Sequence, residues 1–296
     1  MQDTTPLQDQ FPINPDIKTI KLQPGYPAFV IHNAHAQATI ALHGAHLIDF
    51  VPHGEEPVIF MSKAAIFREG KAIRGGIPIC WPWFNAHPTD NSLPSHGYAR
   101  TNFWTLESSH SDASGTRLTF TLPSRERSQL SAILKFHIGK TLSLSLTTSN
   151  EGTDDVTYSE ALHSYFCVSD SRQAHLTGLD QLEYIDTVGE ETRKTQSGDL
   201  TFPGEVDRIY DHATDATLED LITQRKVAIS KTGSHSTIAW NPGIQKGTAM
   251  SDLADDEIHQ FICVEAGNAR EKSITLKAGE SHTIQCQIST VSDGIS

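Results

Sequence analysis

Short stretches in which apolar and polar residues alternate recur along most of the chain. Residues 117–122 (Arg-Leu-Thr-Phe-Thr-Leu) and 141–147 (Thr-Leu-Ser-Leu-Ser-Leu-Thr) follow this alternation strictly. An alternation of period two buries one face of a strand and leaves the other in water, which is typical of antiparallel sheets. Further β-type runs occupy residues 28–32, 38–42 and 45–51. These patterns predict an antiparallel β protein.

The C-terminal part of the chain continues the β pattern. Two alternating runs, residues 273–276 and 283–288, flank a glycine-bearing segment at residues 277–281, which predicts a β-hairpin. Helical patterns are scarce, and the best short candidates are residues 216–222 and 252–259. We therefore expect an all-β fold with few short helices.

The domain organisation follows from length and from the absence of breaks. A chain of 296 residues is long enough for one large β domain or for two ordinary domains. The sequence contains no internal repeat, no low-complexity tract and no linker rich in glycine or serine. We expect one large antiparallel β-sandwich over residues 19–296, preceded by a polar, proline-punctuated arm at residues 1–18.

Charge and composition narrow the possible partners. The chain has 23 basic and 36 acidic residues, a formal net charge of -13, which disfavours nucleic acid or an anionic membrane as a partner. We see no apolar run long enough to span a membrane and no signal peptide, so we expect a cytoplasmic location. No long apolar stripe is left over for an interface, so we expect a monomer.

The four cysteines are widely spaced and form no Cys-x-x-Cys pair, which favours reduced, mostly buried thiols over disulfides or a zinc site. They are Cys80, Cys167, Cys263 and Cys286.

The segment of residues 73–84 (Ile-Arg-Gly-Gly-Ile-Pro-Ile-Cys-Trp-Pro-Trp-Phe) is dense in residues with special backbone requirements. Its two prolines exclude a regular helix and a central strand, because each lacks a backbone donor. Its adjacent glycines permit tight turns and a close approach of the backbone to a ligand. The segment therefore predicts a rigid loop that presents Arg74. Its indoles, Trp81 and Trp83, fit a sugar-stacking platform or, as we favour, a cap on the core.

The histidines first suggest a metal site, because the chain has 15 of them. His32 and His35 are spaced His-x-x-His, as are His43 and His46, but residues three apart on a strand point to opposite faces. The zinc motif His-Glu-x-x-His, the phosphate-binding and dinucleotide-binding glycine motifs and the serine-hydrolase elbow are all absent. We therefore expect neither a metal nor a cofactor.

Three further segments carry candidate chemistry. Residues 93–100 place His96 and Arg100 four apart beside a glycine, although a histidine in such a loop is more often a packing residue. Residues 161–166 place His163 among apolar neighbours. If this segment is a strand, Ala161, His163 and Tyr165 share one face, and Leu162 and Phe166 share the other.

The third segment is residues 261–267, in which Glu265 ends an apolar strand, where a carboxylate needs a partner or a function. Taken singly, His163 and Glu265 are explained equally well as catalytic groups or as buried core groups whose hydrogen bonds are satisfied.

Taken together, five segments resemble those of one family, in the same order along the chain. They are Arg-Gly-Gly-Ile-Pro-Ile-Cys-Trp-Pro-Trp-Phe, Ser-His-Gly-Tyr-Ala-Arg, Leu-His-Ser-Tyr-Phe, Asp-Arg-Ile-Tyr and Cys-Val-Glu-Ala-Gly, between residues 74 and 267. The chain is similar to the hexose-6-phosphate mutarotases, the glucose-6-phosphate 1-epimerase branch of the aldose 1-epimerase family. The resemblance implies a galactose-mutarotase-like β-sandwich with a sugar groove on one sheet.

The resemblance also implies roles for individual residues and a small-molecule sugar phosphate as the substrate. His163 would protonate the ring oxygen, and Glu265 would take the proton from the anomeric hydroxyl. The implied substrate-binding residues are Asp207 for sugar hydroxyls, Arg74 and Arg100 for the 6-phosphate, and His96 beside Ser95 along the sugar ring.

The residues agree with this chemistry when they are read independently. Interconversion of anomers needs ring opening, rotation about C1–C2 and closure on the other face. Ring opening needs one acid and one base on opposite sides of C1, and imidazole and carboxylate can supply them. Two arginines suit a phosphate through their forked donors. No cofactor or metal is required.

Three alternatives remain. A carbohydrate-binding or sugar-sensing β-sandwich without catalytic activity does not need both His163 and Glu265. A mutarotase for neutral sugars does not need two arginines. A glycosidase needs paired carboxylates, and only Asp207 is available to accompany Glu265.

Overall fold

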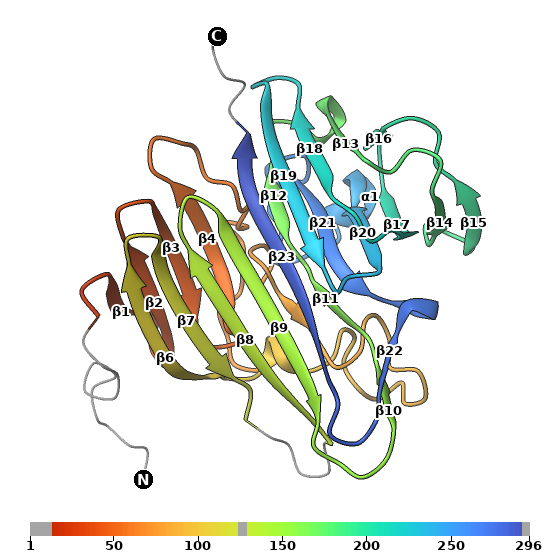
Figure 1. Ribbon diagram of the computed structural model, residues 1–296. Coiled ribbons are helices and arrows are strands. Elements are labelled where there is room, and N and C mark those ends of the chain that lie inside the picture. Colours follow the sequence, from red (N-terminus) through yellow and green to blue (C-terminus); the bar gives the residue numbers. More distant parts are fainter. Residues whose placement is uncertain (1–13, 124–128, 292–296) are drawn as a thin grey trace.

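Antiparallel sheets make up most of the molecule, which is described by a computed structural model over residues 14–123 and 129–291 (Figure 1). Within these residues, helix is limited to α1 (Gly243–Gly247) and short 3₁₀ turns. The all-β prediction is therefore confirmed. No helix in the described segments is long and apolar enough to cross a membrane.

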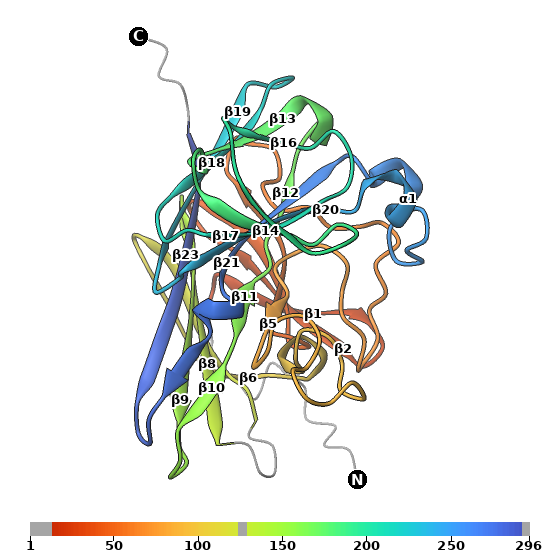
Figure 2. The same cartoon turned by 90° about the vertical axis from the view of Figure 1, so that its right-hand side faces the viewer.

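A nine-stranded sheet forms one layer of the sandwich. It is the large sheet in the foreground of Figure 1 and is seen edge-on in Figure 2. Its strands, in spatial order, are β16 (Leu200–Thr201), β13 (Ala174–Thr177), β18 (Ala216–Asp220), β19 (Arg225–Thr232), β23 (Ser281–Val291), β9 (Leu142–Asn150), β8 (Leu130–Ile138), β7 (Gly115–Thr121) and β6 (Thr105–Asp112).

An eight-stranded sheet packs behind one part of this layer. Its strands, in spatial order, are β15 (Thr192–Thr195), β14 (Glu183–Asp186), β17 (Val206–Asp211), β20 (Ser236–Asn241), β21 (Phe261–Asn268), β11 (Glu160–Leu162) and β5 (Ile79–Cys80), and β12 (Tyr165–Cys167) also pairs with β21.

Two smaller sheets and the 3₁₀ turns complete the fold. The strands of the four-stranded sheet, in order, are β1 (Ile17–Gln23), β2 (Tyr26–His32), β3 (Ala36–Ala41) and β4 (His46–Pro52), and β10 (Val156–Tyr158) pairs with β22 (Ile274–Leu276). The 3₁₀ turns are η2 (Ala99–Thr101), η3 (Ser171–Gln173), η4 (Asp255–Glu257) and η5 (Arg270–Lys272).

The main hydrophobic core lies between the layers and draws on the nine-, eight- and four-stranded sheets. Leu142, Leu144 and Leu146 of β9 are fully buried, while Ser143 and Ser145 between them are partly exposed. Val264 of β21 and Phe29 of β2 belong to the same cluster of buried side chains. The strict alternation read from the sequence thus corresponds to a strand with one face against the core.

Three local predictions are wrong. The expected hairpin of residues 273–288 does not form, because β22 pairs with β10, and β23 lies in the interior of the large sheet between β19 and β9. Residues 216–222 begin with the strand β18, whose alternate residues are buried. Of residues 252–259, only the three residues of η4 are helical. Of the expected N-terminal arm, residues 1–13 lie outside the described residues, and β1 begins at Ile17.

The loop of residues 73–84 is held by close backbone contacts. Gly75 and Gly76 have φ values of 104° and 67°, and a Cβ atom on Gly76 would lie 2.3 Å from His46 Nε2. At Gly97, where φ is 71°, a Cβ atom would lie 2.0 Å from the carbonyl oxygen of Trp81. That oxygen accepts hydrogen bonds from the backbone amides of Tyr98 (3.0 Å) and Ala99 (3.2 Å). The glycines therefore allow the loop of residues 73–84 to pack closely against the loop that contains Gly97 and against His46 of the four-stranded sheet.

We predict that Gly97→Ala destabilises the protein far more than Gly279→Ala. Both glycines have a left-handed φ, 71° and 77°, but a Cβ atom on Gly279 meets nothing within 4 Å. The matched pair separates backbone strain from the close approach to Trp81. We expect Gly97→Ala to cost at least about 1 kcal/mol more in the free energy of unfolding, measured in urea. Equal losses would show that the contact with Trp81 does not constrain the fold.

Candidate active site

A cavity of about 370 Å³ lies over the face of the eight-stranded sheet that points away from the main core. It contains every site residue predicted from the sequence. These residues are Arg74, Ser95, His96, Arg100, His163, Asp207 and Glu265. They come from five separate parts of the chain, so the fold brings together what the sequence only suggests.

The register of the strands explains how Asp207 and Glu265 reach the cavity. Asp207 of β17 lies opposite Trp240 of β20, and Ile238 of β20 lies opposite Glu265 of β21. Residues two apart on a strand share a face, so these four side chains lie on the same side of the sheet. On β21 the intervening residue, Val264, points into the main core.

His163 lies at an interruption between β11 and β12. Its backbone amide donates to the carbonyl oxygen of Pro78 (3.0 Å), and regular pairing with β21 resumes at Tyr165. His163 and Tyr165 line the cavity, whereas Leu162 and Phe166 belong to the main core. The predicted division of faces therefore holds for these residues although the strand is broken.

His163 and Glu265 lie in direct contact, with 3.3 Å between Nε2 and Oε1. Both are buried, and in the described part of the chain His163 Nδ1 and Glu265 Oε2 have no hydrogen-bond partner. Burial, followed by the charges of His96, Arg100 and Arg74, holds the pKa of His163 well below its usual value. Burial, followed by the nearby Asp207, raises the pKa of Glu265 well above its usual value. Both shifts disfavour the charged form of the group concerned, so burial favours a neutral imidazole beside a neutral carboxyl over an ion pair.

His96 forms the neighbouring wall of the cavity in a left-handed conformation, with φ of 64°. Its Nδ1 accepts a hydrogen bond from the backbone amide of Asn85 (3.3 Å), and its ring meets the edge of Phe84 at 4.9 Å between centroids. Burial, with Arg100 and Arg74 as further causes, lowers the pKa of His96 to about 3. His96 is therefore a neutral polar group, and its ring lies 6.0 Å from that of His163 between centroids.

The two arginines are oriented by different contacts. Arg74 donates from Nε to Asp252 Oδ1 (3.1 Å) and from Nη1 to the hydroxyl of Tyr165 (3.0 Å). Arg100 donates from Nη2 to the backbone carbonyl oxygen of Ser95 (3.0 Å). Its buried Nε has no hydrogen-bond partner among the described residues. Both guanidinium groups therefore retain donor atoms for an anion in the cavity.

Several lining residues were not predicted from the sequence. They are Phe84, Asn85, Ile238, Trp240, Lys246 and Met250, and Tyr165 was placed on this face without a role. Trp240 could have been found from its two-residue spacing from Ile238 in an apolar strand. Of the two tryptophans expected to cap the core, Trp81 does so, because it is buried and its Nε1 donates to Thr148 Oγ1 (2.9 Å). Trp83 packs against the same core but stays partly exposed.

The other candidate chemistry is distributed through the fold. No group of three or more His, Cys, Asp or Glu side chains within residues 14–123 and 129–291 could hold a metal ion. All four cysteines are free thiols, and three of them are buried, with Cys167 partly exposed.

The chain is similar in sequence to a family of epimerases and to proteins provisionally named after that activity. The sequence model of the family described as aldose 1-epimerase matches residues 27–289. The chain belongs to the aldose 1-epimerase family. It is also 35% identical over 264 residues to an Escherichia coli K12 protein provisionally named a glucose-6-phosphate 1-epimerase, in an alignment that covers 86% of this chain and 88% of that protein.

Solved structures agree with this membership. A Salmonella typhimurium protein provisionally described as a mutarotase superposes with a TM-score of 0.88 at 30% identity, over 95% of each chain. A galactose mutarotase-like protein from Lactobacillus casei shares the fold, with a TM-score of 0.68 at 15% identity over 89% of this chain and 100% of that one. The fold is thus galactose-mutarotase-like, and the chain is an isomerase that interconverts sugar anomers.

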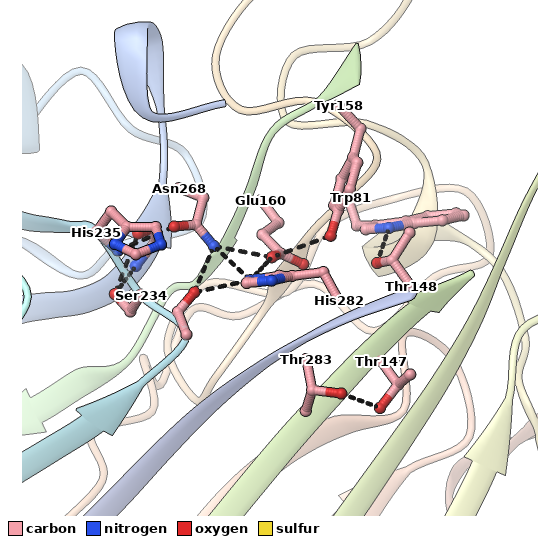
Figure 3. A network of polar contacts seen from close by, with 12 residues as sticks. Trp81, Thr147, Thr148, Tyr158, Glu160, Ser234, His235, Asn268, His282 and Thr283 are labelled. Atoms are coloured by element: carbon pink, nitrogen blue, oxygen red, sulfur yellow. Dashed lines mark hydrogen bonds and ion pairs between the residues drawn. The ribbon is translucent and has the colours of Figure 1, made fainter. Parts of the chain in front are cut away.

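A buried polar network formed by residues of β11 and β21 lies near the His163–Glu265 pair in the chain (Figure 3). Glu160 of β11 and Asn268 of β21 lie opposite each other, each three residues from His163 or Glu265. Glu160 Oε1 accepts from Asn268 Nδ2 (3.0 Å) and from the hydroxyl of Tyr158 (3.4 Å). In the described residues its Oε2 has no partner, and burial raises the pKa of Glu160 to about 8.

We predict that Glu160→Gln removes a pH-dependent loss of stability. The folded state binds the Glu160 proton up to a pKa of about 8, whereas the unfolded state releases it near 4.5. The free energy of unfolding therefore falls as pH rises between these two pKa values, and above the higher one it stays at its reduced value. We expect Glu160→Gln to gain at least about 1 kcal/mol on wild type between pH 5 and pH 8, measured by urea unfolding.

The exposed Glu190→Gln controls for the change in net charge. A pH dependence of unfolding that is the same in Glu160→Gln and wild type would contradict the burial argument.

Proposed function

We propose that the chain interconverts the α and β anomers of hexose 6-phosphates, with glucose 6-phosphate as the substrate. The observation that carries this proposal is a buried His163–Glu265 contact in the same cavity as two guanidinium groups with free donors. An acid and a base suit ring opening, and two cations suit a phosphate. We also expect the protein to act as a monomer in the cytoplasm.

The proton count of the pair fits the reaction. In ring opening, Glu265 takes the proton of the O1 hydroxyl while protonated His163 gives its proton to O5, and the C1–O5 bond breaks. This leaves a C1 aldehyde, a neutral imidazole and a protonated carboxyl, which is the protonation that the buried pair favours in the empty site. After rotation about C1–C2, the O5 hydroxyl attacks C1, His163 takes the O5 proton, and Glu265 returns a proton to O1. No proton is gained or lost over the cycle.

Other residues in the cavity supply orientation. Asp207 and Trp240 are neighbours across two strands, so a carboxylate for sugar hydroxyls lies beside an aromatic face for the apolar side of the ring. His96 accepts from the backbone amide of Asn85 at Nδ1, so its neutral ring carries its proton on Nε2 and presents that atom as a donor. These groups fix which carbon of the sugar faces the acid and the base.

The charge distribution favours an anionic substrate. The chain carries a net charge of -13, yet Arg74, Arg100 and Lys246 meet in this cavity. Lys246 is already paired with Glu205, with 3.0 Å between Nζ and Oε1. The arginines are therefore the better candidates for the 6-phosphate, and a neutral sugar would not require them.

The reaction is tested by exchange NMR on the anomeric protons of glucose 6-phosphate, with glucose in parallel. We expect wild type to accelerate exchange of the phosphate and not of glucose. His163→Ala and Glu265→Gln should each lose about 10²–10⁴-fold of the protein-dependent rate, because each removes one proton transfer. Glu160→Gln, which changes a buried glutamate outside the cavity, should retain the rate.

Circular dichroism and urea unfolding establish that the inactive variants are folded. Anomer exchange above background in both His163→Ala and Glu265→Gln would contradict the assigned roles. Equal acceleration of glucose would contradict the phosphate site. No acceleration of either sugar would indicate a carbohydrate-binding module without catalytic activity.

We predict that Arg74→Ala mainly raises KM for glucose 6-phosphate. A hydrogen bond to a charged group contributes about 1.5–3 kcal/mol, so we expect an increase of about 10- to 100-fold. Arg172→Ala is a matched control, because Arg172 is exposed and pairs with Asp170 outside the cavity. An unchanged KM in Arg74→Ala would remove this residue from the phosphate site.

A further inference from the structure

We propose that the anionic group held by Arg74 and Arg100 activates the acid–base pair as well as anchoring the substrate. A separate phosphate-like dianion in the cavity would then accelerate anomer exchange of a sugar that carries no phosphate. This inference rests on the proposed function, and it adds a catalytic role for a part of the substrate that does not react.

A chain of direct contacts connects Arg74 to His163. Arg74 Nη1 donates to the hydroxyl of Tyr165, whose ring stacks on the imidazole of His163 with 4.9 Å between centroids and 13° between planes. Asp252 holds Nε of the same guanidinium at 3.1 Å. Burial holds the pKa of the Tyr165 phenol well above its usual value, so the phenol is a neutral spacer. The cation is therefore fixed one aromatic ring away from the general acid.

In the empty site, the surroundings of His163 oppose its protonation. Arg100 lies on η2, Arg74 lies on the loop before β5, and His96 meets the imidazole edge-on at 6.0 Å. On the sheet side, Glu265 contacts His163 Nε2, and Trp240 adds an uncharged aromatic edge at 6.1 Å. The two cations and burial disfavour the imidazolium that ring opening requires.

The cations act unequally on the two members of the pair. Both Arg74 and Arg100 disfavour protonated His163. The charges that act on Glu265 are those of Asp207 and Arg100. A dianion bound between the arginines cancels the influence of Arg74 mainly at His163, so it raises the proton affinity of the imidazole more than that of the carboxyl. The shared proton then moves from Glu265 to His163, which is the arrangement that opens the sugar ring.

The buried position of the cavity strengthens the effect of a bound dianion on the two proton affinities. Charges interact more strongly in a buried site than in water, because the surroundings screen them less. Binding energy from a remote part of a substrate can be used to stabilise the transition state at the reacting centre. A dianion that only anchored the sugar would lower KM, whereas a dianion that also moves the proton raises kcat.

The test uses D-xylose, which has the ring atoms of glucose but lacks the C6 group that carries the phosphate. Protein-dependent anomer exchange of xylose is measured by NMR with and without phosphite dianion, at constant ionic strength set with chloride. Exchange catalysed by phosphite itself is subtracted from samples without protein. We expect phosphite to raise the protein-dependent kcat for xylose at least ten-fold.

Variants separate this activation from general effects of the salt. Glu265→Gln should show no protein-dependent exchange with phosphite, because the base is missing. Arg74→Ala should lose the ratio of rates with and without phosphite, because it removes both the cation and part of the anion site. Arg172→Ala should keep the wild-type ratio, since that arginine is exposed and pairs with Asp170.

Glucose 6-phosphate is run alongside to separate the two proposals. If the protein accelerates exchange of glucose 6-phosphate and phosphite does not activate exchange of xylose, the inference is wrong and the proposed function stands. Competition of phosphite with glucose 6-phosphate without activation of xylose also overturns the inference, because the dianion would then supply affinity alone. If glucose 6-phosphate is not accelerated at all, both proposals are overturned.

Discussion

The arrangement of the active site depends on one backbone oxygen, the carbonyl of Trp81. It accepts hydrogen bonds from two successive amides, those of Tyr98 and Ala99, and it approaches Gly97 so closely that no side chain fits there. This contact joins the loop of residues 73–84, which carries Arg74, to the segment that carries His96 and Arg100. The indole of Trp81 is anchored in the core through Thr148 of β9. Two cations and a histidine are thus positioned by the packing of the sandwich.

The other half of the site depends on the two-sided character of β21. One face of this strand packs into the main core, while the other carries Cys263, which packs in a second cluster of buried side chains, and Glu265, which lines the cavity. Burial lowers the pKa of His163 and raises the pKa of Glu265, so both shifts favour the neutral groups over an ion pair. A pair of this kind can give and take a proton in either direction, which is what a reversible isomerase needs.

Much of this could be predicted from the sequence, for reasons that differ between residues. Strands such as β9 show strict alternation, because one face is buried and the other is wet. The segments around Arg74, His96, His163, Asp207 and Glu265 resemble a known family in a fixed order, and the structure places all of these residues in one cavity. The predicted hairpin failed because local pattern does not show that β23 has both edges occupied. The spacing of Trp240 and Ile238 in the sequence shows that they share a face, but that this face lines the cavity depends on cross-strand register, which a single sequence does not contain.

His163 lies in the break between β11 and β12 and Glu265 lies within β21, whereas Arg74 lies on a loop and Arg100 on a 3₁₀ turn. In the proposed mechanism, the sheet therefore carries the reacting groups and the loops carry the groups that select the substrate, and these parts can vary independently. Changes in the loops can redesign what the cavity accepts while the sheet keeps the reacting groups in register. A protein with this arrangement can evolve to accept different sugars while it keeps the same acid and base.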